Sequence, residues 1–318
     1  MRLLGRCDAP GMFKNARLRP VRLLFATDLH GLPGHLQELA QCVRTYQPQV
    51  LLVGGDALPD ANPADPAGSQ AQFVLTEMRQ YFNEIKTQHP FISIAVIFGN
   101  HDWLCSYDAM VELEQSNLVQ VIRSDHPIGL AGHTFLGYWY APPCPYAVKD
   151  FERFDRRGRT YPFDGGLIWD REGGRPVPVD PLVHLGQMPS MWEDLARVPA
   201  VDTPDWIFVA HAPPARTDLD ILTGIGHVGS EAVKEFILQR QPLLSLHGHI
   251  HESPRLSGRF WQGLGRTIAI NPGQQDDRLA AVLVDILDAA ITLTPLGVEG
   301  ASGQAAVTLP RDLARRPA

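Results

Sequence analysis

Five short apolar runs in this chain each end in side chains of the kinds that bind metal ions. In chain order, the run ends read "ATDLHG", "VGGDALPD", "IFGNHDW", "VAHAPP" and "LHGHIHE". Apolar runs of this length, bounded by Gly, Asp, Asn and Pro, are typical of buried strands. In open α/β sheets, ligands bind in the crevice beyond the carboxyl ends of the strands. We therefore expect five separate segments to deliver polar groups to one rim.

The polar groups at these positions are carboxylates, one amide and imidazoles. They are Asp28, His30, Asp56, Asn100, His101, Asp102, His211, His249 and His251. A ligand set of this kind without thiolates favours Mn, Fe or Zn over an iron–sulfur or structural cysteine site. Two ions at the roughly 3.5–4 Å separation of binuclear sites need a bridge, and a carboxylate with two oxygens suits that role. We expect a centre with two divalent transition metal ions, with Mn favoured among the three.

Together the five blocks resemble the calcineurin-like metallophosphoesterase superfamily. Its pattern is D-x-H, then G-D, then G-N-H-[DE], then a lone His, then G-H-x-H, and all five blocks occur here in that order. The resemblance covers roughly residues 21–290, and "INPGQQ" adds to it. A single block is a weak signal, because Asp, Asn and Gly also favour turns and short motifs match by chance. Five blocks in order, each after an apolar run, are a strong signal.

The resemblance implies which residues bind which ion. The first ion would be bound by Asp28, His30, Asp56 and His251, and the second by Asp56, Asn100, His211 and His249. Asp56 would then bridge the two ions. The implied reaction is an in-line attack on phosphorus by a hydroxide held between the metals.

Two residues of the third block are left off the metals by this assignment. His101 is free to act on the substrate and would protonate the leaving oxygen. Asp102 beside it would set the tautomer or orientation of His101. Asn100, together with the metals, would neutralise charge on the non-bridging phosphoryl oxygens. The expected catalytic residues are therefore Asn100, His101 and Asp102.

The hydrophobic pattern alternates between strands and helices along the chain. Helices are expected at about residues 36–46, 70–86, 107–115 and 230–240, and strands at 21–27, "QPQVLLVGGD", "FISIAVIFGN", 118–122, "HTFLGYWY", "WIFVAH", "PLLSLHG", "TIAIN" and "AAVLVDIL". Early βαβ units followed by strands close in sequence indicate two sheets packed face to face with helices outside. The predicted fold is an α/β four-layer αββα sandwich with two mixed sheets, which the resemblance also implies.

The ligand positions argue for one domain, although 318 residues could form two. A site assembled from positions 28 to 251 cannot be divided at a linker. We expect an N-terminal extension over 1–20, a metallophosphoesterase domain over 21–300 and a flexible tail over 301–318. An irregular insertion at about 141–204, rich in Pro, Gly and aromatics, is expected beside the metal cleft. Tyr138, Tyr140 and Trp169 either stack on a substrate group or simply pack a surface loop.

The loop that follows the lone His is a candidate for substrate contact. Ser230 is a good N-cap for a helix that begins at Glu231. Exposed amides at such a helix start can hold an anion, although Glu231 competes for the same positive end. His227 and Arg216 are the candidate substrate contacts of this loop.

Charge and cysteine content restrict the partners and the compartment. The net charge is −7 and no block of Lys or Arg indicates a nucleic-acid surface. Four scattered cysteines form no C-x-x-C pair, as expected for reduced thiols in a cytoplasmic protein. The first twenty residues lack the apolar core of an export signal, and no stretch reaches the length of a membrane span. The expected partner is a small phosphate ester, with nucleotides among the candidates.

The motifs also discriminate among substrate classes. Calcineurin-type phosphoprotein phosphatases carry arginines within G-D-x-x-D-R-G and after N-H-E, whereas "GGDALPDAN" and "GNHDWLC" lack both. This removes the bidentate clamp for a dianionic monoester, so we favour a phosphodiester. A general phosphomonoesterase and a catalytically inactive scaffold of the same fold remain alternatives. A scaffold is expected to lose ligands, and this chain retains all of them.

Overall fold

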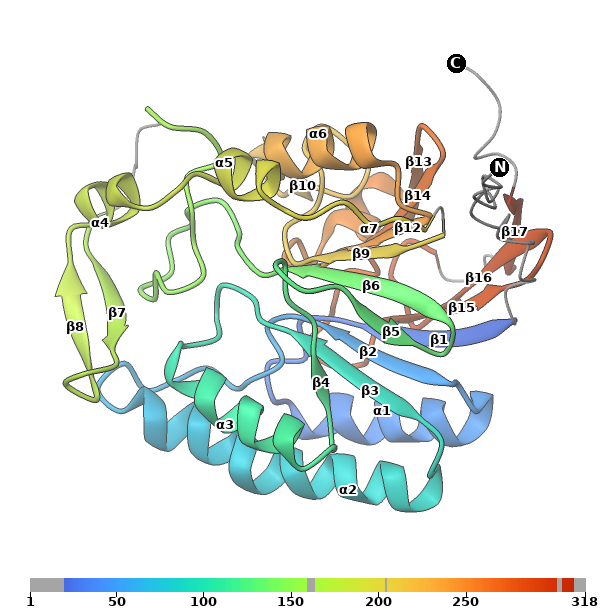
Figure 1. The fold of residues 1–318 in the computed structure, drawn as a ribbon, viewed down its shortest axis with the longest axis horizontal. Helices are drawn as coiled ribbons and strands as arrows, with labels where there is room; N and C mark the ends of the chain where they lie inside the picture. The colour runs from blue at the N-terminus through green and yellow to red at the C-terminus, as the bar shows by residue number, and fades with distance from the viewer. Residues whose placement is uncertain (1–19, 159–163, 204, 302–304, 312–318) are drawn as a thin grey trace, which may run out of the picture.

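Two large mixed β-sheets lie face to face between layers of helices (Figure 1). The computed structural model describes residues 20–158, 164–203, 205–301 and 305–311. The two sheets and the helices on their outer faces confirm the predicted four-layer αββα sandwich. Within the described residues, no helix is long and apolar enough to span a membrane.

The first sheet has seven strands. Its spatial order is β17 (Val307–Pro310), β16 (Ala290–Leu296), β15 (Ala281–Ile286), β1 (Val21–Ala26), β2 (Val50–Gly54), β3 (Ser93–Ile97) and β4 (Gln120–Val121). The strands β1 to β4 are parallel, and β15, β16 and β17 extend the sheet in antiparallel pairs.

The second sheet has six strands. Their order is β13 (Trp261–Leu264), β14 (Thr267–Ile270), β12 (Leu244–Leu246), β9 (Ile207–Ala210), β6 (His133–Tyr138) and β5 (Ile128–Leu130). The four central strands are parallel, and β13 and β5 are antiparallel edges. The carboxyl ends of the parallel strands β6, β9 and β12 therefore lie at the same end of this sheet.

Helices cover the outer face of each sheet. The first sheet is covered by α1 (Pro33–Tyr46), α2 (Arg79–Gln88) and α3 (Cys105–Gln115), and the second by α5 (Met191–Ala196) and α6 (Glu231–Arg240) (Figure 1). The expected helix at 70–86 is longer than predicted, because two π-helical segments, η1 (Ala67–Ala71) and η2 (Val74–Met78), lead into α2.

Strand β1 shows why the apolar runs form buried strands. Leu23 and Phe25 point into the core between the two sheets, whereas Leu24 and Ala26 pack against the helices. Successive side chains of a strand face opposite sides, so a strand buried on both faces needs a continuous apolar run. Polar side chains such as Asp28 therefore follow only where the strand has ended.

The insertion at about 141–204 contains more regular structure than its sequence indicates. It includes a hairpin of β7 (Gly166–Asp170) and β8 (Arg175–Val179), then α4 (Pro181–Gln187) and α5, with the hairpin and α4 projecting on the left of Figure 1. The elements are short and β8 contains two prolines, which hides their periodicity. Residues 1–19 of the expected N-terminal extension and residues 302–304 and 312–318 of the expected tail lie outside the described residues. Within that tail, Val307–Pro310 forms strand β17 of the first sheet.

Candidate metal centre

All seven predicted metal ligands meet where the strands of both sheets end. They follow β1, β2, β3, β9 and β12, and are Asp28, His30, Asp56, Asn100, His211, His249 and His251. Three groups of three have ligand atoms within 4.8 Å of one another. One joins His30 to Asp60 and His101, and the other two contain only predicted ligands: Asp28 with His30 and His251, and Asp56 with His211 and His249. These last two groups correspond to the two sites that the sequence predicts, while the role of each residue as a ligand stays a prediction.

The backbone turns sharply at four of these positions. Asp28, His30, Asp56 and His249 have positive φ angles of 54°, 47°, 47° and 68°. Residues other than glycine adopt this left-handed conformation at a cost of about 1–3 kcal/mol each, and such residues cluster at functional sites. Backbone hydrogen bonds between the first two loops hold the turns, from Asp28 N to the Gly55 oxygen (3.0 Å) and from His30 N to the Asp56 oxygen (2.9 Å).

In the first group, three side chains converge on one point. His251 Nε2 lies 3.4 Å from Asp28 Oδ1 and 3.4 Å from His30 Nε2. The Asp28 carboxylate also accepts the His249 backbone N–H, at 3.1 and 3.0 Å from its two oxygens. This bond fixes the fifth motif block against the first.

In the second group, His211 lies at the centre. Its Nε2 is 3.1 Å from Asp56 Oδ2 and 3.0 Å from Asn100 Oδ1, and its Nδ1 is 3.0 Å from the Gly54 carbonyl oxygen. The carbonyl contact assigns the proton to Nδ1, which leaves Nε2 as the nitrogen that can bind an ion. Asp28 Oδ1 lies 4.0 Å from the same Nε2, so the two groups adjoin.

Two motif glycines make room for the carboxylates. A Cβ atom at Gly99 would lie 2.2 Å from Asp56 Oδ1, and one at Gly248 would lie 2.3 Å from Asp28 Oδ2. Contacts this short do not occur between real side chains, so any larger residue would displace a predicted ligand. The glycines in "GNHD" and "GHIH" are therefore required by the geometry of the site.

Burial and neighbouring charges set the protonation of the predicted ligands. Burial raises the pKa of the Asp28 carboxyl, but hydrogen bonding to His251 and the nearby imidazoles outweigh it and lower that pKa to about 2. Burial and the charge of His211 lower the pKa of His249 to about 3. Burial also lowers the pKa of His211, but the adjacent Asp56 carboxylate prevails and raises it to about 9. An ion binds the deprotonated ligand, so His211 must release a proton when one binds.

The donor set fits divalent metal ions. Asp28 and Asp56 are 0% and 1% exposed, and two carboxylates buried this closely need compensating positive charge. Imidazole nitrogens and carboxylate oxygens together suit Mn, Fe or Zn.

The sequence profile of the calcineurin-like phosphoesterase family matches residues 21–253. The chain belongs to this family. The membership inferred from the five blocks is therefore confirmed, and the use of divalent metals in the family agrees with the two groups of donors. No curated protein matches the chain at a significant level.

Solved structures share the fold of this family member at low sequence identity. One crystal structure is 16% identical over 87% of this chain and 99% of its own length, with a TM-score of 0.58. The crystal structure of TT1561 of Thermus thermophilus is 14% identical over 92% of this chain and 100% of its own, with a TM-score of 0.50. An archaeal phosphodiesterase is 10% identical over 91% of this chain and 99% of its own, with a TM-score of 0.37. For the first two structures, the likeness at such identities concerns the fold alone.

The partner of His101 differs from the predicted one. Asp102 is buried and accepts backbone N–H groups, from Gly99 at 2.9 Å and from Leu58 at 3.3 Å, so it holds two loops together. The carboxylate near His101 is that of Asp60, whose Oδ1 lies 3.5 Å from His101 Nδ1. The predicted orienting role of Asp102 is therefore wrong, because its two carboxylate oxygens contact the backbone of Gly99 and Leu58 rather than the imidazole of His101. Asp60 was present in the second block, "VGGDALPD", but no spacing rule singled it out.

The two candidate substrate contacts in the loop before α6 are each paired with a carboxylate. His227 Nδ1 lies 2.8 Å from Asp220 Oδ1, and Arg216 Nε lies 3.0 Å from Glu231 Oε1. Their roles stay predictions. The helix start after Ser230 is occupied as well, since Asp155 accepts N–H groups from Glu231 at 2.9 Å and Ala232 at 3.2 Å. The expected anion position at α6 is thus filled by a carboxylate of the insertion.

The three aromatic residues considered for stacking on substrate or for packing a surface loop all pack against other side chains of the protein. Tyr138 is 1% exposed and belongs to the core between the second sheet and helices α5 and α6, so it is wrong as a stacking candidate. Tyr140 lies beneath the Arg153 guanidinium, 4.0 Å from its ring centroid. Trp169 packs against the small cluster that contains Trp103. The aromatic residue that reaches the centre is Tyr146, whose ring centroid is 3.7 Å from that of His101.

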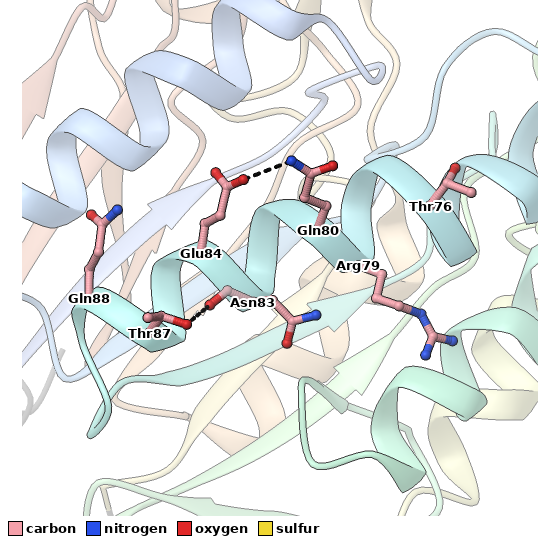
Figure 2. Close-up of a pocket in the computed structure, with 7 residues that line it drawn as sticks. All are labelled: Thr76, Arg79, Gln80, Asn83, Glu84, Thr87 and Gln88. Atoms are coloured by element: carbon pink, nitrogen blue, oxygen red, sulfur yellow. Dashed lines mark hydrogen bonds between the residues drawn. The ribbon is translucent and has the colours of Figure 1, made fainter.

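A surface hollow elsewhere on the molecule is lined by none of the predicted metal ligands or catalytic residues. It measures about 450 Å³ and lies along η2 and α2, lined by Thr76, Arg79, Gln80, Asn83, Glu84, Thr87 and Gln88 (Figure 2). Its polar side chains are satisfied locally: Gln80 Nε2 donates to Glu84 Oε1 at 2.9 Å, and Thr87 Oγ1 donates to the Asn83 carbonyl at 2.8 Å.

Proposed function

We propose that this protein hydrolyses phosphodiesters with two divalent transition metal ions as cofactors. The observation that carries the proposal is the meeting of two donor groups at one rim, Asp28 with His30 and His251, and Asp56 with His211 and His249. Asn100 joins the second group through His211. We further propose Mn(II) as the metal, because the carboxylate oxygens of Asp28 and Asp56 suit it among the three candidates.

Besides the metal ligands, His101 is the residue that we propose to take part in the chemistry. When bound, the ions would supply Lewis-acid stabilisation of the phosphoryl group and an activated water. His101 is 14% exposed and its ring centroid lies 4.9 Å from that of His30, so it borders the centre without being enclosed by it. The contact with Asp60 engages Nδ1 and leaves Nε2 to donate a proton to the leaving oxygen.

Charge near the centre supports a diester over a monoester. The Asp60 carboxylate is 86% exposed beside His101 and repels a second negative charge on the substrate. Arg216, the arginine that we expected near the substrate, is bound to Glu231. A monoester dianion therefore meets an acidic neighbour, whereas a diester carries a single charge. Small diesters, with nucleotides among the candidates, are the substrates that we propose.

Hydrolysis of two nitrophenyl substrates in added Mn(II) tests the proposal. We expect a higher kcat/KM for bis-p-nitrophenyl phosphate than for p-nitrophenyl phosphate, because Asp60 repels the second negative charge of the monoester. Both substrates release p-nitrophenol, so the comparison keeps the leaving group the same and changes the charge. The His211→Ala variant serves as the inactive control for contaminating hydrolases. A monoester preference of tenfold, about 1.4 kcal/mol in transition-state stabilisation, would return the protein to the general phosphatases. Hydrolysis of neither substrate would favour the scaffold.

A further inference from the structure

A closed loop of the insertion reaches the metal centre and ends beside His101. Its two arms are joined by backbone hydrogen bonds, from Ala141 N to the Phe151 oxygen (3.1 Å) and from Arg153 N to the Ala141 oxygen (3.0 Å). Tyr146 lies near the tip of this loop and is 51% exposed.

A buried polar clasp fixes the tip of the loop. Lys149 and Glu152 form an ion pair of 3.0 Å in which both side chains are 0% exposed. Lys149 Nζ also donates to the Cys144 carbonyl at 2.8 Å, and Glu152 Oε1 accepts from the Cys144 backbone N–H at 3.3 Å and its thiol at 2.9 Å. Breaking a buried ion pair leaves an uncompensated charge, so the pairing of Lys149 with Glu152 restricts the conformation of the tip.

The clasp is also connected to a predicted metal ligand. Asn100 Nδ2 donates to Cys144 Sγ at 3.4 Å, while Asn100 Oδ1 faces His211. This hydrogen bond fixes the position of the loop relative to the predicted metal centre. Prolines at 142, 143 and 145 restrict the backbone that leads to Tyr146. The Tyr146 ring is therefore pre-organised before any substrate binds.

The position of Tyr146 places an aromatic surface where a leaving group departs. Its ring meets that of His101 at an interplanar angle of 62°, with centroids 3.7 Å apart. His101 is the group that we assign to the leaving oxygen, so the half-exposed ring of Tyr146 borders the leaving group's path. Burial, with Cys144 and the carboxylates of Asp56 and Asp60, raises the pKa of the Tyr146 hydroxyl, which stays protonated at neutral pH.

We propose that Tyr146 determines specificity for the leaving group, and that it selects diesters whose leaving group carries a planar aromatic ring. The exposed face of the Tyr146 ring would stack on that ring. The inference rests on the proposed phosphodiesterase function and narrows its substrate class to aryl and nucleoside diesters.

Two methyl phosphodiesters whose leaving groups have matched pKa values test this inference, one with an aryl and the other with a fluoroalkyl leaving group. In the Mn(II)-loaded protein, Tyr146→Ala should lower kcat/KM for the aryl diester by about three- to tenfold, mainly through KM, because offset aromatic pairs contribute on this scale. The fluoroalkyl diester should be unaffected. Tyr146→Phe keeps the ring and should retain wild-type values on both.

Phe91→Ala is the matched control, since Phe91 is 97% exposed and precedes β3 at the end of the strand away from the centre. Equal losses on both diesters in Tyr146→Ala would show that the ring only supports His101, and unchanged kinetics would show no contact; either overturns the inference. A wild-type protein that hydrolyses neither diester instead contradicts the proposed function and, with it, this inference. Thermal unfolding of each variant checks that the fold is retained.

Discussion

His211 Nε2 lies 3.1 Å from Asp56 Oδ2, although 155 residues separate the two in the chain. Asp56 follows a strand of the first sheet and His211 follows a strand of the second, so this contact joins the two halves of the sandwich. The same Asp56 carboxylate accepts the His101 backbone N–H at 2.8 Å. One buried carboxylate thus fixes the predicted ligands of both sheets and the backbone of the candidate acid.

Replacing His101 should separate chemistry from metal binding. His101→Ala should keep its metal content while turnover of alkyl diesters falls by about 10²–10⁴-fold, the usual range for general acid–base catalysis. The loss should shrink with p-nitrophenolate as the leaving group, because this group needs little protonation. Steady-state kinetics over a leaving-group series, with elemental analysis of the same samples, measures both. Equal losses for all leaving groups would argue against the acid role.

Asp60 should act through His101. Because its carboxylate is 86% exposed and 3.5 Å from His101 Nδ1, Asp60→Ala should reduce turnover of poor leaving groups without lowering stability. In the double variant with His101→Ala, the Asp60 substitution should add no further loss, which a double-mutant cycle measures. Additive losses would indicate that Asp60 acts independently of His101.

Asp102 should affect stability more than catalysis. Its replacement by Ala leaves the backbone N–H groups of Gly99 and Leu58 without their acceptor, at a cost of about 1–3 kcal/mol for each buried donor. Urea unfolding should show this loss, and the leaving-group dependence of turnover should stay that of the wild type. A changed leaving-group dependence with unchanged stability would restore the orienting role expected from the sequence.

The buried ion pair of the insertion should be sensitive to loss of one partner. Glu152→Ala leaves the Lys149 ammonium buried without its carboxylate, so we expect the free energy of unfolding to fall by about 3–5 kcal/mol. Asp108→Ala is the matched control, because Asp108 is 72% exposed in its pair with Arg171 and should contribute less than about 1 kcal/mol. Denaturant unfolding measures the free energy of unfolding of both variants. Equal losses of this free energy in the two variants would contradict a structural role for the clasp.

The sequence predicted the parts of the site that depend on strand periodicity. Phe25 and Leu24 alternate between two buried faces, so the first polar residues beyond β1, among them Asp28, had to emerge at its carboxyl end. The same reasoning applies to the residues after β2, β3, β9 and β12. It predicted correctly that the candidate ligands meet at one rim of the sheets. The helix at Ser230 was predictable as well, because its N-cap is local: Ser230 Oγ accepts the Val233 N–H at 3.0 Å.

What could not be predicted depends on side-chain partners chosen by packing. Asp102 is next to His101 in sequence but turns back to the Gly99 amide, and Asp60 takes the expected place. Asp155 fills the start of α6 from 76 residues away. Tyr146 has no periodic signal, because its loop is held by a buried polar clasp rather than by an apolar stripe. Such contacts between irregular segments leave no pattern in hydrophobicity.

Elemental analysis of the purified protein after dialysis against Mn(II) tests the central claim most directly. The two donor groups predict about two ions per chain in the wild type. Asp56→Asn should lower occupancy at both positions, because Asp56 is the predicted bridge, whereas Asp108→Asn at the exposed surface should retain both ions. A wild-type protein that binds no ion would contradict the binuclear centre. Full two-ion occupancy in Asp56→Asn would contradict the bridge.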